Sequence, residues 1–112
     1  MWLFTTDGFF SAVSDRDDDR TIIVRSRVHD DAARLVNATG VGRVIETHDS
    51  DYRFRVRLPR AAWVAYVTAA AEAIDYSNFK ATVAVRQGAS RSHVYADVWA
   101  VMRTLKAAEE RR

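Results

Sequence analysis

The sequence predicts an α+β two-layer sandwich, an antiparallel sheet of about four strands with helices on one face. Apolar residues alternate with arginines over residues 52–58, and this period of two is typical of a half-buried strand. Segments of strand-like composition dominate the chain up to Pro59, and helical spacing prevails after it. The length of 112 residues suits one domain. We expect this domain over residues 1–106, followed by a flexible C-terminal tail at 107–112.

Two strands open the chain. Residues 2–13 are rich in aromatic residues and threonine, which suit a pleated surface. Asp7-Gly8 within this segment indicates a bulge or a tight bend. After a polar turn, residues 21–28 form the second strand. We expect the two strands to pair as a hairpin with a long loop.

A short helix over residues 31–38 comes next. Asp30 is placed to be its N-cap, and Gly40 is placed to end it in the left-handed conformation. Residues 41–47 predict a short third strand. The aspartates and the serine of residues 48–51 predict a turn, because their side chains cap local backbone groups.

The fourth strand, residues 52–58, shows the clearest periodicity in the chain. Its apolar side chains are expected to face the core and its arginines to face the other way. The predicted core residues are Tyr52, Phe54, Val56 and Leu58, and the residues of the opposite face are Arg53, Arg55 and Arg57. Pro59 stops the strand, because proline has no N–H to donate to a neighbouring strand.

Three helices complete the chain. Residues 61–74 and 91–106 carry apolar side chains at helical spacing, and residues 79–87 form a shorter helix between them. Ser77 or Asn78 caps this short helix. The apolar stripe of residues 91–106 is wide, so we expect that helix to be substantially buried. The predicted order of elements is β-β-α-β-β-α-α-α.

The composition excludes several classes of protein. Cysteine is absent, which excludes disulfides and thiolate chemistry. No apolar run approaches the ~20 residues of a membrane span, and the N-terminus lacks the features of a signal peptide. We therefore expect a cytoplasmic protein without a membrane partner.

Charge is distributed unevenly. Residues 1–51 contain ten acidic and six basic residues, whereas residues 52–112 contain five acidic and eleven basic residues. Fifteen of the seventeen basic residues are arginine. This excess fits a GC-rich genome, and it also fits recognition of anions by the planar guanidinium group.

No motif predicts a metal, a cofactor or an enzyme. His29 and His48 precede aspartate clusters, but neither cluster has the spacing of an established metal site, and no phosphate-binding loop is present. His93 and Asp97 lie four residues apart, where a pair would suit general-base catalysis, but no nucleophile motif accompanies them. The polar and aromatic segment 75–80 is better explained by docking and capping of the short helix than by function.

The strongest candidate for a binding site is an arginine-rich sheet face. This arginine face consists of Arg25, Arg27, Arg53, Arg55 and Arg57, if the second and fourth strands share the sheet. Trp2 or Phe4 would reach it from the first strand. Arginines that follow phosphates and rings that stack on bases are the means by which open sheets bind single-stranded nucleic acid. The alternative is a solvent face whose arginines pair with Glu46, Asp49 or Asp51.

Several segments of the chain are distinctive in combination. They are Met1-Trp2-Leu3-Phe4-Thr5 with Gly8-Phe9-Phe10-Ser11, Ser50-Asp51-Tyr52, Asp75-Tyr76-Ser77-Asn78-Phe79-Lys80, and Val98-Trp99-Ala100-Val101-Met102. In these segments the chain resembles a family of small, uncharacterised bacterial and phage proteins. The resemblance covers nearly the whole chain and implies a bacterial or phage origin and a single stand-alone domain. It implies no reaction, cofactor or catalytic residue.

Three hypotheses of function follow. The first is a non-enzymatic binding or regulatory domain that binds nucleic acid or another anionic partner, such as an acidic protein surface, through the arginine face. The second is a protein-interaction module, either a homodimer or a phage-encoded inhibitor. The third is a small enzyme that uses His93 or His48, which no motif supports.

Overall fold

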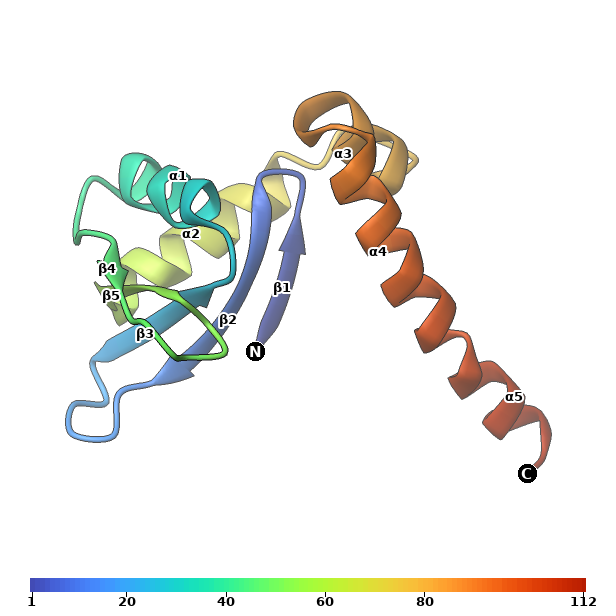
Figure 1. The fold of residues 1–112 in the computed structure, drawn as a ribbon, viewed down its shortest axis with the longest axis horizontal. Coiled ribbons are helices and arrows are strands. Elements are labelled where there is room, and N and C mark those ends of the chain that lie inside the picture. Colours follow the sequence, from blue (N-terminus) through green and yellow to red (C-terminus); the bar gives the residue numbers. More distant parts are fainter. The chain divides into compact units, whose positions relative to one another are not determined.

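The computed structural model describes residues 1–112 and has an α+β fold with a five-stranded antiparallel sheet (Figure 1). Its contacts form two compact units, Met1–Asp75 and Tyr76–Arg112. The first unit contains β1 (Trp2–Thr5), β2 (Gly8–Ser14), β3 (Thr21–Ser26), α1 (His29–Thr39), β4 (Ile45–Glu46), β5 (Phe54–Pro59) and α2 (Arg60–Glu72); the second contains α3 (Phe79–Gln87), α4 (Ala89–Met102) and α5 (Thr104–Glu110). The predicted fold class is confirmed, with five strands rather than four. The single domain over residues 1–106 stays a prediction.

The first predicted strand is a hairpin of two strands. β1 and β2 pair antiparallel as far as Thr5 and Gly8. The Thr5 hydroxyl closes the turn, because it accepts a hydrogen bond from the Asp7 N–H at 3.0 Å and donates one to the Gly8 carbonyl at 3.0 Å. The bend predicted at Asp7-Gly8 is therefore a complete reversal of the chain, and it adds one strand to the sheet. The strand order is β1-β2-β3-β5-β4.

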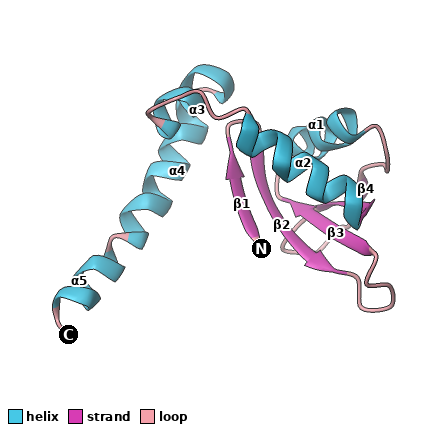
Figure 2. Cartoon of the chain, turned by 180° about the vertical axis from the view of Figure 1, so that it is seen from behind, coloured by secondary structure: helices cyan, strands magenta, loops and turns pink.

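The core lies between one face of the sheet and helices α1 and α2, which lie on that same face (Figure 2). Alternate residues of β2, β3 and β5 point into it, as a half-buried strand requires. Trp63 of α2 packs edge-on against Phe10 of β2, with the ring centroids 6.2 Å apart. The buried cluster consists of Phe10, Ala12, Ile22, Val24, Ala32, Leu35, Phe54, Val56, Leu58 and Trp63. The opposite sheet face is therefore free of α1 and α2.

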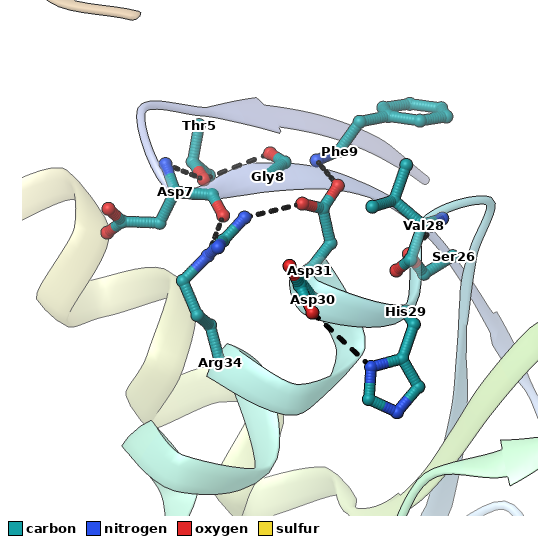
Figure 3. A network of polar contacts seen from close by, with 10 residues as sticks. All are labelled: Thr5, Asp7, Gly8, Phe9, Ser26, Val28, His29, Asp30, Asp31 and Arg34. Carbon is teal, nitrogen blue, oxygen red and sulfur yellow. Dashed lines mark hydrogen bonds and ion pairs between the residues drawn. The ribbon is translucent and has the colours of Figure 1, made fainter. Parts of the chain in front are cut away.

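A buried carboxylate attaches α1 to the β1–β2 turn (Figure 3). Asp31 is 1% exposed; its Oδ2 accepts a hydrogen bond from the Phe9 N–H at 3.1 Å, and its Oδ1 accepts one from Arg34 Nη2 at 2.6 Å. Arg34 Nε donates in turn to the Asp7 carbonyl at 2.8 Å. The backbone at Gly8 approaches so closely that a Cβ there would lie 2.7 Å from Asp31 Cγ. A glycine is therefore required at this position by tertiary contact.

The N-cap predicted for α1 is wrong, and its C-terminal glycine is correct. The helix begins at His29, after Val28, so Asp30 lies in the first turn and caps nothing. Aspartate is favourable at both places, because the first turn also carries the positive end of the helix dipole. Gly40 ends the helix with φ 69°, and its N–H donates to the Val36 carbonyl at 2.9 Å.

The strands that follow α1 are shorter than predicted. β4 comprises only Ile45 and Glu46, whereas the sequence predicts a strand over 41–47. β5 begins two residues later than predicted, which leaves Tyr52 in the preceding loop, and Pro59 is its last residue. α2 begins directly after this proline, so the change from sheet to helix falls where the sequence predicts it.

The second unit is helical, and its first cap is as predicted. The Asn78 Oδ1 accepts a hydrogen bond from the Ala81 N–H at 3.0 Å at the start of α3. The helix predicted over 91–106 is divided at Arg103 into α4 and α5. α5 continues through Glu110, into the segment predicted as a flexible tail. No helix of the structure is both long enough and apolar enough to cross a membrane.

The predicted burial of the last long helix is wrong. Tyr95 is the buried residue of α4. The large apolar side chains of α4 and α5 that remain at least half exposed are Val94, Trp99, Val101, Met102 and Leu105. Within this unit α3 packs along α4, and the apolar residues are distributed around more of the helix than α3 covers.

Candidate functional site

The strand register places Arg25, Arg55 and Arg57 on the side of the sheet opposite α1 and α2. β3 pairs antiparallel with β5, so Arg25 lies directly opposite Arg55, and Arg57 follows two residues further along β5. Residues opposite one another in an antiparallel pair point to the same face. Arg27 and Arg53 lie one residue beyond the ends of their strands. The structure therefore brings the second and fourth predicted strands together, as the arginine-face hypothesis requires.

One row of side chains crosses four strands of the sheet on this face. Trp2 is opposite Ser11, Ser11 is opposite Arg25, and Arg25 is opposite Arg55. We refer to these four residues as the central row. Trp2 is 69% exposed, whereas the two arginines are half-buried. The row therefore begins with an exposed indole ring and ends with two neighbouring cations.

Further aromatic rings lie beside Trp2 at the β1–β2 end of the face. Phe4 and Phe9 are stacked with centroids 4.5 Å apart, and Trp2 meets Phe9 edge-on at 6.2 Å. The sequence analysis expects Trp2 or Phe4 on this face, and the register places both there. Phe9 is not among the predicted residues, because it reaches this face only through the reversal of the chain between Thr5 and Gly8.

Three of the five arginines are neutralised by carboxylates. The ion pairs are Arg27–Asp51 at 2.8 Å, Arg53–Glu46 at 2.5 Å and Arg57–Asp15. Pairing with Glu46 and Asp51 agrees with the alternative interpretation of the face. Asp15, from the β2–β3 loop, is a partner that the sequence analysis does not name. The Arg27–Asp51 and Arg53–Glu46 pairs are exposed on both sides, and pairs of this kind contribute little stability. In the third pair Arg57 is half exposed, whereas the Asp15 side chain is only 9% exposed.

The pairing also shifts two pKa values. The hydrogen bond from Arg27 to Asp51 raises the pKa of Arg27 above its usual value. The pKa of Asp15 is lowered, first by the hydrogen bond from the Asp17 N–H and then by that from Arg57. Both shifts favour the charged forms, so these two ion pairs persist across the neutral range.

Arg25 and Arg55 differ from the other three, because their hydrogen-bond partners are neutral. Arg25 Nη2 donates to the Ser11 hydroxyl at 2.7 Å, and Arg55 Nη2 donates to the Ser50 hydroxyl at 3.1 Å. Arg55 Nε is buried and has no hydrogen-bond partner. Two adjacent, half-buried guanidinium groups are thus held in place by serines, without a carboxylate between them.

The loop before β5 folds onto the arginine face. Arg25 and Arg27 both lie over the ring of Tyr52, at 4.8 Å and 4.4 Å from its centroid. The prediction that Tyr52 faces the core with Phe54 is wrong, because strand alternation does not extend into this loop. Tyr52 is nevertheless buried, and the two cation–π contacts account for its position.

The three histidines lie outside any group of potential metal ligands. The structure contains no group of three potential ligands among histidine and carboxylate side chains. His29 contacts Asp30 at 3.4 Å, while Asp31 points away into the turn (Figure 3). His93 and Asp97 are both exposed on α4, which gives an imidazole none of the burial that tunes a general base.

The segment 75–80 has the structural role that the sequence analysis favours. Phe79 stacks on Tyr95 with a centroid distance of 5.7 Å, and Tyr76 contacts Phe79 at 5.9 Å. These rings dock α3 on α4, and Asn78 caps α3. The residues of this segment are therefore explained by the packing of the second unit.

Comparisons with protein-family models, with curated proteins and with solved structures gave no significant match. The resemblance to small bacterial and phage proteins stays a prediction.

Proposed function

We propose that this chain is a non-enzymatic domain whose arginine face binds single-stranded nucleic acid. The observation that supports the proposal is the central row, which aligns an exposed indole ring with two guanidinium groups that lack carboxylate partners. Arginines contact the phosphates, and an aromatic ring stacks on a base, which every nucleotide offers. Such binding tolerates changes of base sequence.

The charge pairing predicts a weak salt dependence. Arg27, Arg53 and Arg57 already have carboxylate partners, so Arg25 and Arg55 are the cations that a phosphate backbone would neutralise. A single strand releases ~0.7 counterion for each phosphate neutralised. The slope of log K against log salt should therefore be about −1.4, shallower than five free arginines would give.

Fluorescence anisotropy tests the proposal with labelled oligothymidylate, oligoadenylate RNA and a DNA duplex of equal length, each over a range of salt concentrations. We expect both single strands to bind more tightly than the duplex, with the shallow slope given above. Replacing Arg25, Arg53, Arg55 and Arg57 together by Ser should abolish binding, because neither arginine without a carboxylate partner then remains on the face. Binding that survives this fourfold substitution would show that the sheet face is not the site.

The exposed apolar side chains of α4 and α5 favour a second candidate, a protein-interaction module that forms a homodimer. Val94, Val101 and Leu105 recur at spacings of seven and four residues, and each is more than half exposed. Apolar surface of this kind is typical of protein interfaces. Analytical ultracentrifugation should then show a dimer that Val101→Lys dissociates. A wild-type chain that stays monomeric at high concentration would exclude this candidate.

The hypothesis of an enzyme that uses His93 or His48 has the least support, because both imidazoles are exposed. A cytoplasmic location and a bacterial or phage origin belong to the proposal as inferences from the sequence.

A further inference from the structure

We infer that Arg25 and Arg55 form a subsite for one phosphodiester group, with the adjoining base stacked on Trp2. This inference rests on the proposed function and names the chemical group that the central row would bind. The observation that motivates it is that the more buried arginines of the arginine face are the ones that lack carboxylate partners.

The more exposed arginines have anionic partners, and the more buried ones do not. Arg27, Arg53 and Arg57 have side chains 51–56% exposed, and each has a carboxylate. Arg25 and Arg55 are half-buried and have neutral partners only, namely a serine hydroxyl for each and the Tyr52 ring for Arg25. Burial penalises an unpaired charge, so the opposite distribution is expected in a face that serves only structure.

The two arginines without carboxylate partners also occupy directly opposite positions on β3 and β5. Residues directly opposite in an antiparallel pair have Cβ atoms about 4.5–5.5 Å apart, and like charges in this position destabilise the sheet. One anion between Arg25 and Arg55 would remove the repulsion and satisfy both groups. Arg55 Nε is buried and has no acceptor in the structure, so this guanidinium is only partly hydrogen-bonded.

The surroundings of the pair favour a phosphate group over a metal or an apolar ligand. A guanidinium fork matches two phosphate oxygens in a bidentate arrangement. The Ser11 and Ser50 hydroxyls lie within hydrogen-bond distance of the pair, at 2.7 Å and 3.1 Å, and a hydroxyl can turn to donate to an anion. Two guanidinium groups and two serine hydroxyls are thus available on this face, and neither guanidinium has a carboxylate partner.

Trp2 extends the subsite from a phosphate to a nucleotide. It belongs to the same row as Arg25 and is separated from it by the strand of Ser11. Neighbouring strands are about 4.8 Å apart, so the backbones of Trp2 and Arg25 are separated by roughly 10 Å. An exposed ring at this distance suits a base next to the bound phosphodiester. A duplex, whose bases are stacked inside, has no base to offer.

The test compares two double variants with the same loss of charge. In Arg25→Gln/Arg55→Gln the unpaired arginines are removed, and in Arg53→Gln/Arg57→Gln two carboxylate-paired arginines of the same face are removed. We expect the first to weaken binding of oligothymidylate roughly tenfold or more, which is the effect of losing charge-assisted hydrogen bonds. The second should weaken it by less than about threefold, because these two guanidinium groups already have carboxylate partners. Thermal unfolding monitors the fold of both.

A second measurement reads the arginines directly. In a ¹⁵N-labelled wild-type chain, the Nε–H resonances of Arg25 and Arg55 should shift on addition of oligothymidylate, and those of Arg53 and Arg57 should not. Inorganic phosphate should shift the same two resonances but bind more weakly, and Trp2→Ala should weaken only the oligonucleotide.

The outcomes separate the two proposals. Equal weakening by both double variants would overturn the subsite and leave binding by the face as a whole intact. Absence of oligonucleotide binding would overturn the proposed function; phosphate-induced shifts at Arg25 and Arg55 would then support a phosphate site without nucleic acid. Phosphate binding as tight as that of the oligonucleotide, unchanged in Trp2→Ala, would overturn the assignment of the ligand as a nucleotide strand. Shifts at none of the arginines would overturn the subsite.

Discussion

The buried carboxylate of Asp31 provides the most direct test of the fold. Asp31→Ala removes the acceptor of the Phe9 N–H and the partner of Arg34, whose contacts to Asp31 are 3.1 Å and 2.6 Å. A hydrogen bond to a charged group is worth about 1.5–3 kcal/mol. The Arg34 side chain is 44% exposed, so water replaces part of its contact. We therefore expect a loss of about 3 kcal/mol in the free energy of unfolding, within the range for a broken buried pair.

Urea unfolding followed by circular dichroism measures this loss, with two matched variants. Asp30→Ala removes an exposed aspartate from the same first turn of the helix. This substitution should lower the free energy of unfolding by less than about 0.5 kcal/mol. Asp31→Asn retains an acceptor for the Phe9 N–H and should lie between the two. If Asp31→Ala is no more destabilising than Asp30→Ala, the argument that this carboxylate holds α1 to the β1–β2 turn is refuted.

Three further predictions concern packing, pH and capping. Gly8→Ala should destabilise the fold by about 1–3 kcal/mol in urea unfolding, because the new Cβ would lie 2.7 Å from Asp31 Cγ; a neutral effect would refute the close approach. Burial raises the pKa of Tyr66 above 10.0, so stability present below that pH is lost as the pH rises above it. Thermal melts of Tyr66→Phe should not show this loss of stability at alkaline pH. If the melting temperatures of the wild type and Tyr66→Phe depend on pH in the same way, the pKa shift is contradicted. Asn78→Ala removes the cap bond to Ala81 and should cost about 1 kcal/mol, whereas Asn78→Asp should restore it; amide exchange in α3 that does not change would disprove the cap.

Local patterns in the sequence predict the sheet faces well. Alternation over 52–58 places Arg55 and Arg57 opposite the core, because side chains of a strand alternate whatever its neighbours are. The same rule fails for Tyr52, since alternation holds only while the chain stays in the sheet. The position of Arg25 opposite Arg55 depends on which strands pair. The sequence pattern does not show strand pairing, so it predicts a shared arginine face only if these two strands lie in the same sheet.

Features that depend on tertiary contacts are the ones that sequence patterns miss. The turn at Asp7 lies within a continuous strand-like segment, and the need for Gly8 arises from Asp31 in a helix later in the chain. The apolar stripe of α4 shows which side chains favour burial, but it does not show whether another element covers them. Helix periodicity therefore predicts α4 correctly and its burial incorrectly.

The candidate site depends on loops that no strand pattern predicts. Asp15 in the β2–β3 loop and Asp51 in the β4–β5 loop each neutralise an arginine at the margin of the face. The same β4–β5 loop supplies Ser50, a neutral partner, to Arg55 at the centre. A count of arginines therefore overstates the charge that a ligand meets. The loops confine the uncompensated charge to two neighbouring side chains, and such confinement favours contact with a single phosphate over diffuse attraction to any polyanion.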